Sequence, residues 1–180
     1  MMNANTIKIA VFLNTWGNYN ENGADGGFWV NLPCDIDEVM ERLSESTGEE
    51  VDEMEVFIND TDIEGISLEI SEYDNIENLN EIAEALEDLD ETEAEALEAY
   101  LDHGYDMTEA LDKISDNDYM IYFNCNDMTD VAYEYCEETG MLDSIPENLR
   151  NYFDYEAFGR DMSFEGSFYF TNNGNCVQIY

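Results

Sequence analysis

Eight carboxylates recur at helical spacing in the middle of the sequence, and their type and pattern suit them to binding. They are Glu77, Glu81, Glu84, Asp88, Glu91, Glu95, Glu98 and Asp102. They follow one another in steps that alternate between four and three residues, which stacks the acids of any one helix on one face. Such a face attracts cations and basic protein surfaces.

The sequence around these acids is almost free of basic residues. Between Glu69 and Asp118 there are 19 acids and one base, Lys113. A solvated helix face usually pairs Glu with Lys four residues on, whereas like charges at that spacing cost about 0.2–0.5 kcal/mol per pair. A pattern that opposes the stability of its own helices indicates a functional surface. We therefore expect these eight acids to bind a target.

The charge of the whole chain indicates what that target is. The sequence has 45 Asp and Glu against 5 Lys and Arg, a net charge of −40 over 180 residues. Neither nucleic acid nor an anionic membrane attracts such a chain, whereas the basic groove of a DNA-binding protein does. At the charge density of B-DNA, 40 charges correspond to about 68 Å of duplex, or roughly 20 base pairs. Matching that density requires an elongated body.

The elements that position the acids predict an α+β fold, an elongated chain of three small domains. Residues 1–62 form an α+β domain, 63–115 an acidic helical bundle, and 116–180 a second α+β domain. The expected strands are Ile7–Asn14, Phe28–Leu32, Met54–Asn59, Tyr119–Asn124, Ser167–Thr171 and Cys176–Tyr180, with Asn18–Gly27 as a loop. The expected helices begin at the caps Asp35, Asp90 and Asp106, and two more run over Asn75–Leu89 and Asp127–Thr139, with short ones near Pro146 and Ala157.

Several segments resemble the ArdA-type antirestriction proteins over nearly the whole chain. The most specific is Pro146–Asp161, which is similar to the hallmark stretch of that family. The Gly27–Pro33 segment, the preceding Tyr19-Asn20 and the Ile70–Tyr73 stretch also match. The resemblance implies a protein of mobile genetic elements that inhibits type I restriction–modification enzymes as a DNA mimic. It also implies three domains in a curved acidic cylinder.

The same resemblance implies a functional motif and a dimer. The antirestriction motif corresponds to about Leu142–Tyr155, near the dimer contact of the C-terminal domain. Its candidate residues are Leu142, Asp143, Pro146, Glu147, Asn148, Leu149, Tyr152, Phe153, Asp154 and Tyr155. Tyr119, Ile121 and Phe123 are candidates for a homodimer interface at an edge strand, or belong to the core. Arg150 and Arg160 either form internal ion pairs or contact a partner.

Other patterns that suggest chemistry are weak. The acids from Asp60 to Glu64 begin like a calcium loop, but its twelfth position is Ser71 and not Glu, so only diffuse cation binding is expected. His103 is interpreted as a structural residue at a helix end. The sequence has no phosphate-binding glycine loop and no nucleophile with a matching base, so we expect no enzyme, cofactor or metal. The four scattered cysteines and the absence of a leader indicate a reduced cytoplasmic protein.

Two other functions are compatible with the acidity. An acidic chaperone that sequesters basic nucleic-acid-binding proteins would bind them without preference for restriction enzymes. Halophilic adaptation would make the charge a matter of solubility, and the protein would then lose its structure in dilute buffer. Competition with duplex DNA for a type I methyltransferase separates the first of these from the mimic.

Overall fold

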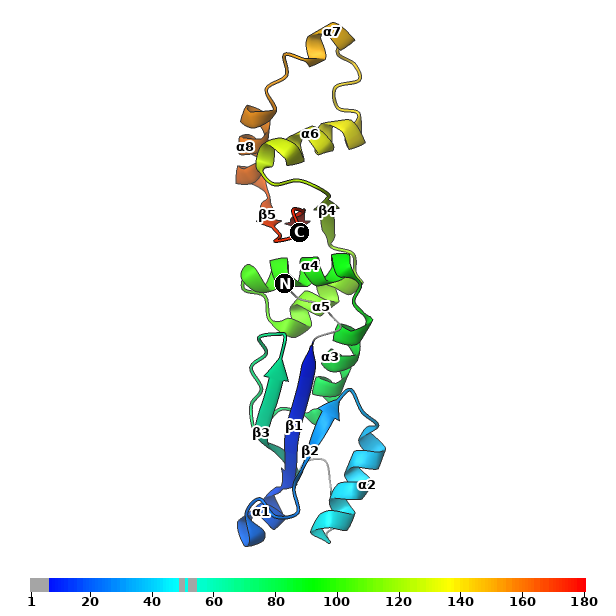
Figure 1. Cartoon of the computed structure of the whole chain (residues 1–180), viewed down its shortest axis with the longest axis vertical. Helices are drawn as coiled ribbons and strands as arrows, with labels where there is room; N and C mark the ends of the chain where they lie inside the picture. Colours follow the sequence, from blue (N-terminus) through cyan, green and yellow to red (C-terminus); the bar gives the residue numbers. More distant parts are fainter. Residues whose placement is uncertain (1–6, 49–50, 52–54) are drawn as a thin grey trace. The chain divides into compact units, whose positions relative to one another are not determined.

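The computed structural model describes residues 7–48, 51 and 55–180, shown in Figure 1. Its contacts divide the chain after Glu91 into two compact units, here the N-terminal unit and the C-terminal unit. Each unit combines helices with one three-stranded antiparallel sheet, which confirms the α+β class. The division into three domains and their elongated arrangement stay predictions. None of the described helices has the length and apolar character needed to cross a bilayer.

The N-terminal unit is built on the sheet order β2-β1-β3. The three strands are β1 (Lys8–Thr15), β2 (Phe28–Leu32) and β3 (Val56–Glu64). β1 lies in the middle, so its apolar residues Ile9, Val11 and Leu13 are almost completely buried. The sequence prediction of β1 and β2 is confirmed. β3 continues five residues beyond the predicted end, and Met54, its predicted start, lies outside the described residues.

The N-terminal unit also contains three described helices: α1 (Trp16–Asn22), α2 (Ile36–Thr47) and α3 (Ile76–Asp88). α2 begins and ends as its sequence predicts, because the Asp35 carboxylate accepts from Glu38 N and Gly48 adopts the left-handed conformation. The prediction of a loop over Asn18–Gly27 is wrong for Asn18–Asn22, which belong to α1, and is confirmed for residues 23–27. Thr15 caps this helix by accepting a hydrogen bond from Asn18 N.

The C-terminal unit contains five helices and three strands among its described residues. The helices are α4 (Glu91–Asp102), α5 (Met107–Ser115), α6 (Met128–Thr139), α7 (Glu147–Arg150) and α8 (Tyr155–Glu165). The strands β4 (Tyr119–Tyr122), β5 (Ser167–Phe170) and β6 (Cys176–Ile179) pair in the order β4-β6-β5. The predicted hairpin around Gly174 is confirmed, and β6, last in sequence, is the central strand.

The two faces of this second sheet are both covered. Tyr122 and Cys176, neighbours across β4 and β6, pack with Val131 of α6 and with Met162 of α8. On the other face Val177 and Ile179 are also buried. α4 contributes Ala96, Leu97, Ala99 and Tyr100, which are fully buried, so this helix is an internal element of the unit.

α8 packs directly against the first turn of α6, and a glycine makes this possible. A Cβ atom built on Gly159 would lie 2.1 Å from the carbonyl oxygen of Met128 and 3.3 Å from the Cβ of Ala132. The two helix backbones therefore approach to a distance that only glycine allows. This contact joins the predicted hallmark stretch, which includes Gly159, to the core of the C-terminal unit.

Candidate functional site

α3 presents its predicted acids to solvent. Glu77, Glu81, Glu84 and Asp88 are exposed, whereas Leu79, Ala83 and Leu86 on the opposite side are buried. The Asn75 side chain caps the helix by accepting from Glu77 N and Asn78 N. Because α3 contains no basic residue, its outer face is an uninterrupted row of carboxylates. Glu87, which the stepwise spacing did not select, is exposed on the same helix.

One acid of that face is held in place by the fold. The Asn80 side chain donates a 2.9 Å hydrogen bond from Nδ2 to Glu84 Oε1. The Asn80 Oδ1 atom accepts a 2.7 Å bond from the backbone N–H of Cys34. Since Asn80 is buried, Glu84 is oriented from below, which reduces the entropy it loses on binding.

The acids of α4 differ in their exposure, and the prediction that Glu95 binds a target is wrong. Glu91 and Asp102 are exposed and Glu98 is half-buried, but the Glu95 side chain is 4% exposed. Its carboxylate accepts hydrogen bonds from Asn173 at 2.6 Å and from Asn175 at 3.0 Å. The Thr171 hydroxyl lies 3.4 Å away. Glu95 therefore joins α4 to the β5–β6 hairpin and presents no carboxylate to a target.

The row of acids does not lie on a single helix, as the break near Asp90 predicts. α3 ends at Leu89, whose φ of −63° and ψ of 130° are extended, and α4 starts at Glu91. The spacing of four and three residues therefore defines one face within α3 and another within α4.

The acids that resemble a calcium loop belong to strand β3. Asp60, Asp62 and Glu64 are all exposed and alternate with half-buried residues, as on the outer face of a strand. β3 pairs with β1, and Lys8 of β1 forms a 2.7 Å ion pair with Asp62. No cluster of three metal-ligating side chains occurs among the described residues. These acids therefore belong to the exposed face of a strand and not to a calcium loop.

The predicted antirestriction motif consists of a loop, helix α7 and the first residue of α8 in the C-terminal unit. Leu142 is buried and Phe153 and Tyr155 are half-buried, whereas Asp143, Pro146, Glu147, Asn148, Leu149, Tyr152 and Asp154 are exposed. Asp154 caps α8 by accepting from Ala157 N at 3.0 Å. The Phe153 ring contacts Tyr155 and Phe158, with centroids 5.0 and 5.6 Å apart. Tyr152 is 84% exposed, which leaves a large aromatic surface open in the motif.

Arg150 holds this loop together. Its Nε donates to the Ile145 carbonyl and its Nη2 to the Asp143 carbonyl, both at 3.1 Å. Its Nη1 also lies 3.3 Å from the Asp143 carboxylate. The internal ion pair, one of the two alternatives for Arg150, is thus present. Arg160 forms a more exposed pair with Asp161 at 3.5 Å.

The sequence was compared with models of known protein families. The model of the ArdA family, described as antirestriction protein, matches residues 11–177. The chain belongs to the ArdA antirestriction family. No curated protein matches the chain. The matched region runs from Val11 in β1 to Val177 in β6 and includes the acidic helices and the motif of this ArdA chain, so antirestriction is its general function.

The strand predicted to mediate dimerisation lies at an edge in this ArdA chain. β4 pairs only with β6 in the described sheet, and β5 forms the opposite edge. Tyr119 and Ile121 are half-buried, and Phe123, just after β4, is 57% exposed. Two more large apolar side chains, Met120 and Tyr180, are also exposed. The dimer itself stays a prediction.

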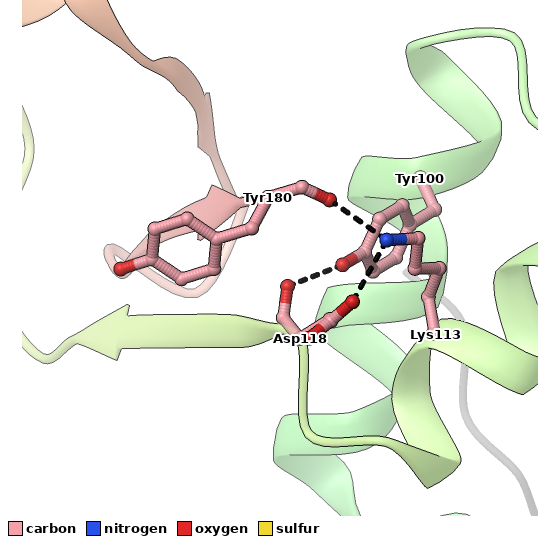
Figure 2. A network of polar contacts seen from close by, with 4 residues as sticks. All are labelled: Tyr100, Lys113, Asp118 and Tyr180. Carbon is pink, nitrogen blue, oxygen red and sulfur yellow. Dashed lines mark hydrogen bonds and ion pairs between the residues drawn. The ribbon is translucent and has the colours of Figure 1, made fainter.

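A polar network joins α4 and α5 to the residue before β4 and the residue after β6. Figure 2 shows its four residues. Lys113 donates to the Asp118 carboxylate at 2.7 Å and to the Tyr180 carbonyl at 3.2 Å. The Tyr100 hydroxyl and the Tyr180 N–H both donate to the Asp118 carbonyl. The hydrogen bond to Asp118 raises the pKa of Lys113. The one base of the acidic segment thus serves the ArdA fold.

His103 has a similar structural position. Its Nδ1 atom lies 2.8 Å from the carbonyl oxygen of Ala99 in the last turn of α4. This contact ties the imidazole to the carbonyl end of the helix, where a positive charge is favourable.

Proposed function

We propose that this ArdA chain is a DNA mimic that occupies the DNA-binding groove of a type I restriction–modification enzyme. The observation that carries the proposal is the exposed, base-free row of carboxylates on α3. Glu77, Glu81, Glu84 and Asp88 stand on one face, and a buried amide orients one of them. A basic groove that binds phosphates by charge and hydrogen bonds also accepts carboxylates so arranged.

The target-binding acids proposed are the seven of the original eight that reach solvent. Glu91, Glu98 and Asp102 on α4 join the four of α3, and Glu95 is left out because it is buried. The net charge of −40 adds long-range attraction, which accelerates association with a positive groove and weakens as salt is added. Binding alone blocks the enzyme, so the proposal includes no catalytic step, cofactor or metal.

The proposal places the protein in the cytoplasm as a homodimer carried by a mobile element. All four cysteines are free thiols, and burial raises the pKa of Cys125 to about 11 and that of Cys176 to about 12. Cysteines that form no disulfide are typical of a reducing compartment. The motif at Leu142–Tyr155 and the β4 edge with Tyr119, Ile121 and Phe123 are the proposed dimer region.

Competition with duplex DNA for a purified type I methyltransferase tests this function. A DNA mimic raises the apparent Kd of DNA in proportion to its own concentration, and less so at high salt. The acidic chaperone instead binds histone-like proteins with the same affinity as the methyltransferase. Binding that leaves the affinity for DNA unchanged would contradict the mimic.

A further inference from the structure

An aromatic slot lined by acids lies on the N-terminal unit at the start of α3, where Glu77 belongs both to the slot and to the carboxylate row. Trp16 at the start of α1 stacks on the buried Phe57 of β3, with centroids 4.0 Å apart and planes 15° apart. The Tyr73 ring is also nearly parallel to that of Trp16, with planes 27° apart and centroids 6.3 Å apart. Tyr73 is 76% exposed, so one wall of the slot is open to solvent.

The spacing of the Trp16 and Tyr73 rings suits a flat group between them. A planar group stacked on both sides needs two contacts of about 3.5 Å, or about 7 Å between rings. The observed 6.3 Å is within a small movement of the exposed Tyr73 side chain. A cavity of about 180 Å³ is lined by both rings. It is smaller than most pockets for whole small molecules, which measure roughly 300–1,000 Å³, so it fits the head of one side chain.

The negative charge around the slot favours a cationic ligand. Glu72, Asp74 and Glu77 line the cavity together with the two rings, and none of its described lining residues is a lysine or an arginine. The Tyr73 hydroxyl hydrogen bonds to Glu72, which raises the pKa of Tyr73. A cation over an aromatic face is attracted by the ring quadrupole, and an adjacent carboxylate adds a direct ion pair.

The turn that carries Tyr73 is ordered before any partner arrives. The Ser71 N–H donates to the Asp74 carboxylate at 2.8 Å, and the Asp74 N–H donates to the Ser71 carbonyl at 3.1 Å. The Ile58 N–H donates to the Glu72 carbonyl at 3.3 Å, which fastens this turn to β3. The turn therefore positions the Tyr73 ring opposite Trp16 at little entropic cost on binding.

We infer that this slot binds an arginine side chain, with the guanidinium between Trp16 and Tyr73 and its N–H groups on the flanking carboxylates. Guanidinium is flat, always charged and well suited to stacking, whereas an ammonium is a compact, strongly hydrated ion. The same unit already contains such a contact, since the Arg42 guanidinium carbon lies 3.9 Å from the Phe28 ring centroid. The inference rests on the proposed function for the source of the arginine, which is the basic groove of the target enzyme.

The binding of a model ligand to the free protein tests the slot by itself. The probe is N-acetyl-arginine amide, followed through the indole N–H signals of Trp16 and Trp29, which the Trp29→Phe variant assigns. We expect a saturable shift at Trp16 and little at Trp29, which does not line the cavity. Tyr73→Ala should weaken binding about fivefold and Tyr73→Phe by less than about twofold, because the ring provides the stacking. Equal binding of the uncharged citrulline analogue, or equal shifts at both tryptophans, would overturn the slot.

Affinity for the enzyme tests where the arginine comes from. Tyr73→Ala should weaken inhibition of the type I enzyme about fivefold. Phe164→Ala is the matched control, since Phe164 is 81% exposed in the other unit, and it should leave inhibition unchanged. Inhibition that Tyr73→Ala does not affect would overturn the assignment of the arginine to the enzyme. If the wild-type chain fails to compete with DNA, the proposed function fails, whereas arginine binding by the free protein still decides the slot.

Discussion

The side-chain amide of Asn173 donates a 2.6 Å hydrogen bond to the carboxylate of Glu95, which lies 78 residues earlier in the sequence. Two further donors, Asn175 and Thr171, converge on the same carboxylate. An acid that belongs by its spacing to the outer row is thus the centre of an internal polar cluster. The cluster joins α4 to the β5–β6 turn.

Replacing Glu95 should therefore affect stability more than any neighbouring acid does. Glu95→Ala removes the acceptor shared by the exposed Asn173, the half-buried Asn175 and the buried Thr171, and we expect a loss of about 2–3 kcal/mol in the free energy of unfolding. Asp102→Ala, at the exposed end of the same helix, should change it by less than about 0.5 kcal/mol. Urea denaturation measures both. Equal effects of the two variants would show that the cluster contributes no stability.

Gly159→Ala tests the close contact between α6 and α8. The new methyl group would meet the Met128 carbonyl oxygen, so one helix must move, and we expect a loss of about 1–3 kcal/mol. Ser163→Ala, on an exposed position of α8, is the control. Thermal unfolding followed by circular dichroism measures the difference. A Gly159→Ala variant as stable as wild type would contradict the helix packing described here.

Neutralising three acids of α3 tests the proposed binding face. The variant Glu77→Gln, Glu81→Gln, Asp88→Asn should fold normally and weaken inhibition of the type I enzyme by about tenfold. The matched control neutralises the exposed acids of α2, with Asp37→Asn, Glu41→Gln and Glu45→Gln, and so removes the same charge. If both variants weaken inhibition equally, the total charge and not the α3 face determines binding.

Alkaline pH should destabilise the C-terminal unit. Burial raises the pKa of Cys125 and Cys176 to about 11 and about 12, from an ordinary value of 9.0. The unfolded chain then loses these protons first as the pH rises, so the stability present below pH 9.0 decreases towards pH 12. Urea midpoints between neutral pH and about pH 10.5 measure the decrease. A Cys125→Ala, Cys176→Ala variant should show a smaller one, and an identical decrease would exclude the thiols as its cause.

Sedimentation of variants at the β4 edge tests the predicted dimer. Phe123→Asp places a charge on an exposed aromatic position, so it should shift the wild-type dimer to monomer without unfolding the chain. Phe164→Asp makes the same change on the exposed part of α8 and should leave the dimer intact. A Phe123→Asp variant that still sediments as a dimer would place the interface elsewhere.

Features encoded by short segments could be predicted from the sequence. Asp106 and Glu109 form a complete capping box at the start of α5, and Gly140 ends α6 in the left-handed conformation. Likewise, the Asn-rich turn at Gly174 is itself a sequence signal for the hairpin of β5 and β6. In each case the residues that specify the structure are within a few positions of it.

Features that depend on distant residues could not be predicted in this way. α1 forms in a segment of poor helix formers because Asn18 is buried and bonds to Asn14 at 2.9 Å. The acids of Asp60–Glu64 resemble the start of a calcium loop in sequence. Only their pairing with β1, which is distant in sequence, shows that they belong to a strand. Likewise the sequence spacing of Glu95 gives no sign of the hairpin that buries it.

The position of β6 has a consequence for the synthesis of the protein. This strand joins β4 to β5, and it follows every other element of its unit along the chain. A ribosome therefore releases both outer strands before the one that unites them, whereas the first sheet is complete once β3 has emerged. We expect the N-terminal unit to fold while later residues are still being synthesised, and the sheet of the C-terminal unit to form only once β6 has emerged. A cell would thus hold an active inhibitor only from chains translated through to β6.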